Sequence, residues 1–418
     1  MTDKGAWDWH SPKKEIPIKE WHNRFNWVEE FHVSPDGEKI AAIVNSDMDE
    51  FMVCVNGETW EEPFEKAGSV TFGPDGRLSV LAAKDEQWSV CTDGVCWETW
   101  FDFIWDLTVS SDGRFIGTAI QTDMKYGMAV NGTPWDTLYE NITGMTLSDR
   151  GSSAAIVQVV PLAQADIDGF SAGIFSAVVN GAAGDETFMN AWDPCFDPQG
   201  KQIAYSVRLD RNRYSLVQNG TVWPTDFQSV WDPRFYNRGQ SVIAPVRING
   251  KWSLFKDGSS LWNRQFDQLW QIRTHEASQK IAAVVSDSYG KWTVCQNNVT
   301  WDFHCSRMIT DLCHSADGTR LAACCKEADT WDLVVDAVPW HLNADKLWAP
   351  VISDDGSVIA ARLEKDHAGY LAVNGKVLAK AFDWVFEPAI SPDGSKILLK
   401  TIKNGIYSRQ VLSLDHVL

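Results

Sequence analysis

Short apolar runs alternate with polar turns along almost the whole chain. One run, Ile40-Ala-Ala-Ile43, follows the turn Ser34-Pro-Asp-Gly37, and another begins at Ile397 after Ser391-Pro-Asp-Gly394. The same turn-and-strand marker recurs at Gly37, Gly76, Gly113, Gly151, Gly200, Gly239, Ser278, Gly318, Gly356 and Gly394. The markers lie 37–40 residues apart, except for one interval of 49 after Gly151. A period of this length made of strands rather than helices is typical of propeller blades.

Each repeat divides into four predicted strands. In the second repeat these are residues 70–72, 78–83, 87–91 and 96–100. An Asn-Gly or Asp-Gly pair such as Asp93-Gly94 or Asn131-Gly132 separates the third strand from the fourth in most repeats. Such pairs adopt the positive φ of tight hairpin turns, so these strands are expected to pair antiparallel. The pattern therefore predicts an all-β fold, a β-propeller of about ten four-stranded units.

The two ends of the chain are predicted to meet in one blade. The last repeat has three strands and ends at Leu418, whereas residues 16–27 resemble the segment that closes the second repeat at residues 98–105. An N-terminal strand in that place would cover an exposed sheet edge. We therefore expect a tail over residues 1–15 and a propeller over residues 16–418. A single ring is favoured because no linker interrupts the middle of the chain, and two five-bladed propellers are the alternative.

Composition narrows the class of protein. The chain contains 22 tryptophans, most of which recur once per repeat, as at Trp60, Trp97 and Trp135, so they are interpreted as packing residues between blades. A formal net charge of −19 argues against nucleic-acid binding. No signal-peptide core and no apolar run of bilayer length is present, which favours a cytoplasmic protein that meets the membrane only through other subunits.

The nine cysteines form no recognisable metal or haem motif, since neither C-x-x-C nor C-x-x-C-H occurs. Their odd number and the missing export signal favour reduced thiols, although Cys91 and Cys96 flank a hairpin turn and could approach each other. His304, Cys305, Cys313 and His314, with His341, fall in one region. Whether they converge on a soft metal is left open, and chance grouping is favoured.

A catalytic constellation is not evident. Gly169-Phe-Ser171-Ala-Gly173 matches the nucleophile-elbow pattern, but that chemistry needs a strand-to-helix turn and a downstream acid and histidine. We therefore expect a protein that is not an enzyme, has no catalytic residue and carries no cofactor or metal. The alternative is a propeller hydrolase or lyase whose site lies at the mouth of the ring.

Two features that break the repeat are the candidate partner contacts. The first is residues 161–170, inserted between the second and third strands of the fourth repeat, where apolar and acidic residues mix: Leu162, Asp166, Ile167, Asp168 and Phe170. The second is the head of the chain, where aromatic residues precede any strand: Trp7, Trp9 and His10. Insertions and exposed aromatic residues commonly carry protein contacts.

The Ser-Pro-Asp-Gly repeats resemble TolB-like and WD40-like propeller repeats over the whole chain. The N/D-G-x-x-W pattern at Trp60, Trp97, Trp135 and Trp223, with Phe-x-x-x-Trp segments such as Phe227–Trp231, resembles the tryptophan-rich D subunits of Tmc complexes, the transmembrane redox complexes of sulfate-reducing bacteria.

This resemblance implies a cofactor-free scaffold subunit in sulfate respiration. Its implied partners are an iron–sulfur subunit, a membrane cytochrome b and a tetrahaem cytochrome c. The implied location is the cytoplasmic side of the inner membrane, and no catalytic residue carries over.

Overall fold

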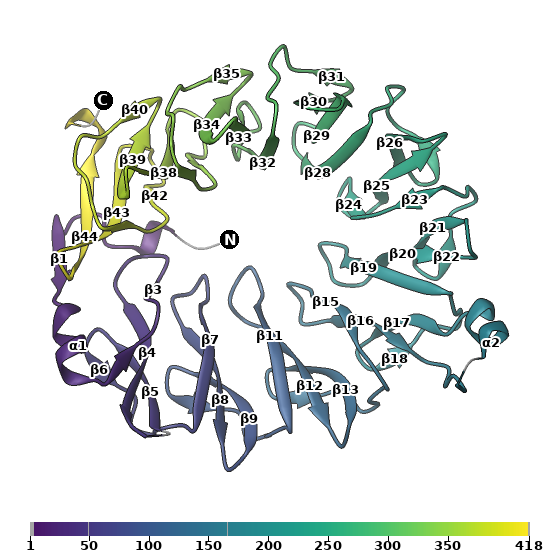
Figure 1. Ribbon diagram of the computed structural model, residues 1–418, viewed down its shortest axis with the longest axis horizontal. Helices are drawn as coiled ribbons and strands as arrows, with labels where there is room; N and C mark the ends of the chain where they lie inside the picture. The colour runs from purple at the N-terminus through teal and green to yellow at the C-terminus, as the bar shows by residue number, and fades with distance from the viewer. Residues whose placement is uncertain (1–3, 49, 165, 417–418) are drawn as a thin grey trace. The chain divides into compact units, whose positions relative to one another are not determined.

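The computed structural model describes residues 4–48, 50–164 and 166–416. It confirms the all-β prediction, because the chain forms ten four-stranded blades of a β-propeller (Figure 1). Two compact units account for these blades. Unit 1 comprises residues 50–51 and 61–265, and unit 2 comprises residues 4–48, 52–60 and 266–416. Among the described residues, no helix is both long enough and apolar enough to cross a bilayer.

Unit 1 holds blades 2 to 6, and the strands of blades 2 to 5 pair in chain order. Blade 2 consists of β7 (Lys66–Phe72), β8 (Leu78–Lys84), β9 (Gln87–Thr92) and β10 (Val95–Cys96). Blade 3 consists of β11 (Phe103–Val109), β12 (Ile116–Thr122), β13 (Lys125–Val130) and β14 (Thr133–Pro134). Blade 4 consists of β15 (Thr143–Leu147), β16 (Ser153–Gln158), β17 (Phe175–Val179) and β18 (Ala182–Ala183), with helix α2 (Ile167–Ala172). Blade 5 consists of β19 (Asn190–Phe196), β20 (Ile203–Arg208), β21 (Tyr214–Gln218) and β22 (Thr221–Val222). Blade 6 consists of β23 (Ser229–Val230), β24 (Arg234–Tyr236), β25 (Ser241–Ile248), β26 (Lys251–Lys256) and β27 (Ser259–Ser260).

Unit 2 holds blades 1 and 7 to 10. Blade 1 consists of β2 (Trp27–Val28), β3 (His32–Val33), β4 (Ile40–Asp47), β5 (Glu50–Val55) and β6 (Glu58–Thr59). Blade 7 consists of β28 (Gln268–His275), β29 (Lys280–Ser288), β30 (Lys291–Gln296) and β31 (Val299–Thr300). Blade 8 consists of β32 (Met308–His314), β33 (Leu321–Glu327), β34 (Thr330–Val335) and β35 (Val338–Pro339). Blade 9 consists of β36 (Lys346–Leu347), β37 (Val351–Ile352), β38 (Ile359–Lys365), β39 (Ala368–Val373) and β40 (Lys376–Val377). Blade 10 consists of β41 (Trp384–Val385), β42 (Ala389–Ile390), β43 (Lys396–Lys403), β44 (Ile406–Ser413) and the N-terminal β1 (Lys13–Ile16). The remaining elements of unit 2 are η1 (Lys4–Ala6), α1 (Lys19–Arg24) and η2 (Leu414–His416).

The first strand of most blades is bulged. In blade 3 the register shifts between Trp105 and Thr108, where Asp106 adopts a φ of +54°. Blade 5 has the same shift after Trp192, with Asp193 at a φ of +52°. In blades 1, 6, 9 and 10 the first strand is divided into two short segments that pair with the same second strand. A bulge bends the strand, which explains this recurring interruption.

An N-terminal strand does complete blade 10, but not with the predicted residues. Strand β1 (Lys13–Ile16) pairs antiparallel with β44 (Ile406–Ser413), Ile16 opposite Tyr407. The predicted segment 16–27 is instead mostly the helix α1, because only Ile16 and Trp27 of it lie in strands. The similarity to residues 98–105 came from Trp21, which is buried beside Ile18 and Phe25 in the core of unit 2 and does not enter the sheet.

The core lies between neighbouring blades. The second and third strands supply small and branched apolar residues, most of them fully buried, as in Ile40–Val44. Aromatic residues from the first strand and from the segment after the fourth strand add to these layers, for example Phe101 and Trp97 at the blade 2–3 interface. The periodic aromatic residues therefore fill the wedge between diverging sheets.

Candidate functional site

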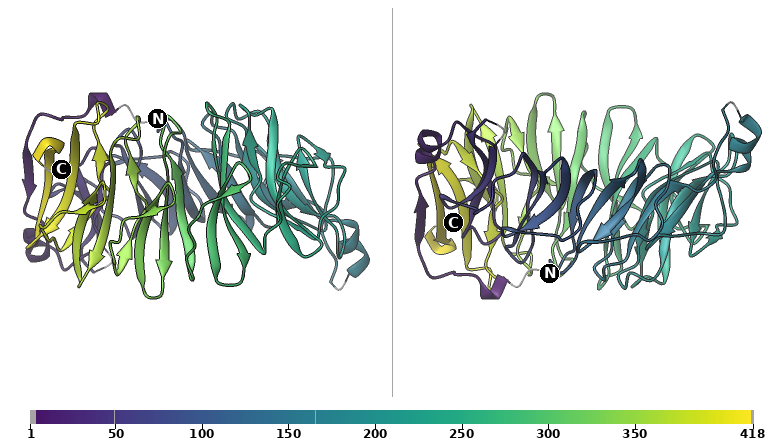
Figure 2. Two further views of the ribbon diagram at one scale, coloured as in Figure 1. Left: turned by 90° about the horizontal axis from the view of Figure 1, so that it is seen from above. Right: turned by 90° about the horizontal axis from the view of Figure 1, so that it is seen from below.

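The insertion of blade 4 lies between β16 and β17, as the spacing of the repeats predicted, and it contains helix α2. The helix extends beyond the strands of its own blade (Figure 2). Asp166 caps its N-terminus, since the Asp166 carboxylate accepts a hydrogen bond from the Gly169 backbone N–H at 2.8 Å. Gly173 ends it with a φ of +104°. The carboxylate of Asp166 therefore caps the helix. Asp is one of the preferred residues at a helix N-cap, so the sequence could have indicated this role.

The apolar side chains of this insertion are directed to solvent. Ile167 is 72% exposed, and Val160, Leu162 and Phe170 are also exposed. Asp168, in the first turn of α2, is exposed beside them. We call Val160, Leu162, Ile167 and Phe170 the insertion surface. Among the other residues that the structure describes, the exposed large apolar side chains are spread over separate segments, as with Val95 and Tyr289, so the insertion surface is a local concentration.

The structure does not form a nucleophile elbow at Ser171. This residue lies in the last turn of α2 and is exposed, whereas the elbow requires a strand that leads directly into a helix. The α2 helix follows a loop, so the sequence match reflects composition only.

The head of the chain lies against blade 10. Trp9 is only 8% exposed and packs on Ala389 and Leu398. Its indole N–H donates to the Lys4 carbonyl at 2.8 Å, and its own carbonyl accepts from Lys396 Nζ at 2.9 Å. Trp9 therefore anchors the head within its own chain. Its ring is not available to a partner pocket in the way that the sequence suggested.

The neighbours of Trp9 are differently placed. Trp7 is half-buried, with its ring 6.1 Å from that of Trp9, and His10 is exposed. The carboxylate of Asp8 accepts hydrogen bonds from the backbone N–H groups of His10 and Ser11. The hydrogen bonds from Ser11 and His10 hold the Asp8 pKa well below its usual range. The head is thus an ordered turn held by internal contacts.

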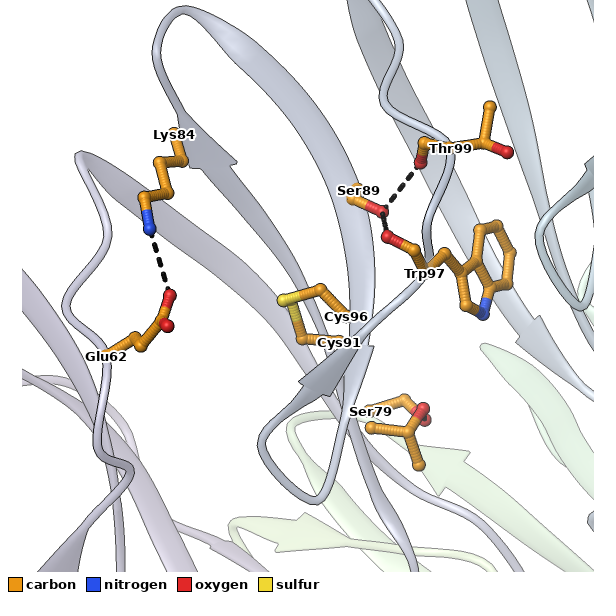
Figure 3. The surroundings of a disulfide bond; sticks show 9 residues. Glu62, Ser79, Lys84, Ser89, Cys91, Cys96, Trp97 and Thr99 are labelled. Atoms are coloured by element: carbon orange, nitrogen blue, oxygen red, sulfur yellow. Dashed lines mark hydrogen bonds and ion pairs between the residues drawn. A yellow bond between two sulfur atoms is a disulfide. The ribbon is translucent and has the colours of Figure 1, made fainter.

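Blade 2 contains a disulfide between Cys91 and Cys96 (Figure 3). The two residues lie directly opposite each other in the β9–β10 hairpin. The expectation that all thiols are reduced is therefore wrong for this pair. Cys54 and Cys295 occupy the same position in blades 1 and 7 but face Thr59 and Thr300, which explains why neither forms such a bond. The pairing register, rather than cysteine spacing alone, decides the outcome.

A cavity of about 350 Å³ opens between blades 2 and 3 within unit 1. Its lining combines two guanidinium groups with polar and apolar side chains: Arg77, Thr92, Asp93, Val95, Cys96, Trp97, Arg114, Ile116 and Asn131. Thr92 and Val95 are opposite each other in the hairpin, next to the Cys91–Cys96 pair, and Cys96 of the disulfide is itself one of the lining residues. Sequence reasoning missed this cavity. The sequence feature that could have indicated it is an arginine directly after the marker glycine in two successive repeats.

The structure places His304, Cys305, Cys313 and His314 in and beside blade 8. Across the described ranges, no group of three or more His, Cys, Asp or Glu side chains is arranged to hold a metal ion. His314 is half-buried with its ring 6.0 Å from that of His275, and neither of its ring nitrogens is hydrogen-bonded in the described part of the chain. Burial, with His275 nearby, lowers its pKa to about 4. The Cys305 Sγ–H donates to the Met308 carbonyl, so this thiol is hydrogen-bonded within its own chain.

No protein-family model and no curated protein matches this chain. Solved structures do show similarity. One described as the crystal structure of the eukaryotic initiation factor has 13% sequence identity and a TM-score of 0.50, over 78% of this chain and 89% of that one. Another, the structure of the Dos1 propeller, has 12% identity and a TM-score of 0.38, over 96% and 94%. The first likeness, at such low identity, concerns the fold alone.

Proposed function

We propose that this chain is a non-catalytic interaction subunit that binds a protein partner through the insertion surface of blade 4. The observation that carries the proposal is the concentration of exposed apolar side chains, Ile167 foremost, in and next to the segment 161–170 that is inserted into the fourth repeat. Helix α2 is not part of the β-sheet of blade 4. Exposed apolar groups on such a segment are typical of contact sites.

The charges beside the insertion surface indicate the kind of partner. Asp166 and Asp168 flank Ile167, and the whole chain is strongly acidic. A partner with an apolar pocket and a basic rim would match both features, because opposite charges speed association and exclude acidic competitors.

The partner class in this proposal comes from the sequence resemblance to the tryptophan-rich Tmc subunits. On that basis the chain would be cofactor-free and located on the cytoplasmic side of a membrane redox complex. Its partners would be the iron–sulfur subunit, the membrane cytochrome b or, less directly, the tetrahaem cytochrome c. The support for this part is the repeat-level pattern around Trp60, Trp97, Trp135 and Trp223.

The test is purification of the tagged chain from its native host, with the co-purifying proteins quantified by mass spectrometry and by haem and iron–sulfur absorbance. Two changes to the insertion are compared with the natural sequence: Ile167→Asn with Phe170→Ser, and replacement of residues 161–170 by a Gly-Asn turn. We expect both to keep the melting temperature and to lose most of the bound partner. Tyr289→Ser is the matched control, since Tyr289 is a fully exposed aromatic residue on the corresponding loop of blade 7.

Two results would contradict the proposal. If both insertion variants retain the partner at the level of the Tyr289→Ser control, the insertion surface is not the contact. If the purified chain itself carries a stoichiometric haem, flavin or iron–sulfur cluster, the cofactor-free role is wrong.

A further inference from the structure

The interface between blades 2 and 3 has a cavity, whereas the next interface is closed. At the next interface, between blades 3 and 4, Trp135 fills the corresponding space and is only 7% exposed. Its indole N–H donates to the hydroxyl of Ser153 at 2.8 Å, which fixes the ring against blade 4. The residue equivalent to Ser153 in blade 3 is Ile116, which offers no acceptor. Trp97, the equivalent of Trp135, stays half-buried and lines an open cavity.

Two arginines from successive blades line this cavity. The equivalent residues of the other repeats carry no guanidinium: Glu38, Ser152, Lys201, Gln240, Gln279, Thr319, Ser357 and Ser395. Arg77 Nε contacts the Asp75 carboxylate at 2.6 Å, and its terminal nitrogen donates to the Gly113 carbonyl. Arg114 is held in the same way by Asp112, through Nε. Each guanidinium has five N–H donors, so these contacts orient the group and leave further donors on it.

The lining is more positive than the protein that surrounds it. Arg77 and Arg114 against Asp93 give it a formal charge of +1, in a chain of net charge −19. Asp93 is turned toward its own blade, where its carboxylate accepts from the Leu78 backbone N–H at 3.1 Å. Asp75 and Asp112 do not line the cavity. Guanidinium pairs of this kind suit a carboxylate, because they donate parallel charge-assisted hydrogen bonds.

We propose that this cavity binds a small organic carboxylate, with the carboxylate on Arg77 and Arg114 and the apolar body against Trp97, Val95 and Ile116. Its volume lies at the lower end of the range of roughly 300–1,000 Å³ for ligand pockets, which favours a small molecule over a peptide. This site is separate from the insertion surface. Its test can therefore fail or succeed independently of the proposed function.

The experiment uses the full chain labelled with 5-fluorotryptophan and observed by ¹⁹F NMR, with benzoate as the probe and benzamide as its uncharged match. A Trp97→Phe sample identifies the Trp97 resonance. We expect benzoate to shift that resonance saturably, while the Trp135 resonance at the closed interface does not move. Benzamide is expected to bind at least about tenfold more weakly, because it lacks the charge that the guanidiniums recognise.

Three variants locate the binding. Arg77→Gln with Arg114→Gln is expected to weaken benzoate about tenfold or more. Val95→Trp, at an exposed position of the cavity wall, is expected to fill the space and abolish the shift even if the arginine variant folds poorly. Arg150→Gln, an exposed arginine on the corresponding turn of blade 4, is the control and is expected to bind as the natural sequence does.

The proposal is overturned if benzoate leaves the Trp97 resonance unmoved, if benzamide binds equally well, or if benzoate binding survives in the Val95→Trp protein.

Discussion

The side-chain oxygen of Asn131 accepts a hydrogen bond from the backbone N–H of Ile116 at 2.8 Å, and this contact ties the hairpin turn of blade 3 to the start of its second strand. The amide nitrogen of Asn131 donates to the Arg114 carbonyl in the turn just before that strand. The contact recurs in nine blades at 2.8–3.1 Å, with Asn or Asp always at the turn. Two properties therefore favour Asn or Asp before the turn glycine. The side chain accepts this hydrogen bond, and the residue adopts a φ of 45–52°.

Asn131→Ala is predicted to destabilise the protein by about 2 kcal/mol, because two hydrogen bonds are lost and alanine disfavours the positive φ. Asn131→Asp is the matched control. Asp93, Asp257 and Asp336 already fill this position in other blades, so we expect Asp to retain most of the stability. Urea unfolding of both variants measures the difference. Equal stability of the alanine and aspartate variants would show that the side-chain clamp contributes nothing.

Tyr407 of blade 10 holds the first turn of blade 1. Its hydroxyl donates to the Gly37 carbonyl at 2.7 Å, and the side chain is completely buried. Tyr407→Phe is predicted to cost about 1–3 kcal/mol, since the buried carbonyl loses its donor. Tyr370→Phe, at the corresponding half-buried position of blade 9, should change stability by less than about 0.5 kcal/mol. Chemical unfolding compares the two, and a loss no larger for Tyr407→Phe than for Tyr370→Phe would contradict the role assigned to the hydroxyl.

Lys400 gives the stability a dependence on alkaline pH. It is almost fully buried, and its ammonium donates to the carbonyls of Ser34 and Pro35. Burial lowers its pKa to about 8, partly opposed by Glu387. An unfolded lysine titrates near a pKa of about 10.4. Between these values the unfolded state binds more protons, so the contribution of Lys400 makes the folded state more stable as pH rises from about 8 to about 10.4.

Lys400→Met should therefore remove this rise. At pH 7 the loss of the donor to the Ser34 and Pro35 carbonyls opposes the gain from no longer burying a charge, so the diagnostic is the pH dependence and not the stability at one pH. The measurement is the free energy of unfolding of both proteins across this pH window. The natural sequence and the variant have the same thiols and tyrosines. The difference between their free energies of unfolding therefore isolates the contribution of Lys400. A difference that does not vary with pH would refute the assignment.

The Cys91–Cys96 disulfide is predicted to stabilise the protein by about 2 kcal/mol, the loop-closure value for so short a loop. A reductant should therefore lower the melting temperature of the natural sequence. The Cys91→Ser, Cys96→Ser protein should melt at the temperature of the reduced natural sequence and should not respond to the reductant. A natural sequence that is equally unresponsive to reductant would contradict this prediction.

The sequence by itself determined the architecture of the blades. Short apolar runs, turn residues that adopt positive φ, and a nearly constant spacing are local properties, so four strands per repeat and the inserted segment of blade 4 could be located without coordinates. The same local information misplaced the N-terminal strand. The sequence around a tryptophan can look the same whether the residue lies in a strand, as Trp105 does, or in a helix, as Trp21 does.

Only the tertiary structure decided what equivalent residues do. Trp97 and Trp135 occupy the same position in their repeats, yet one lines a cavity and the other is buried, with its indole N–H on Ser153 of the neighbouring blade. Cys91 is bonded and Cys54 is not, since their partners across the hairpin are Cys96 and Thr59. Trp9 packs on Leu398, nearly the whole chain away. Trp135 and Trp9 each contact a residue outside their own segment, and the fold alone brings these residues together.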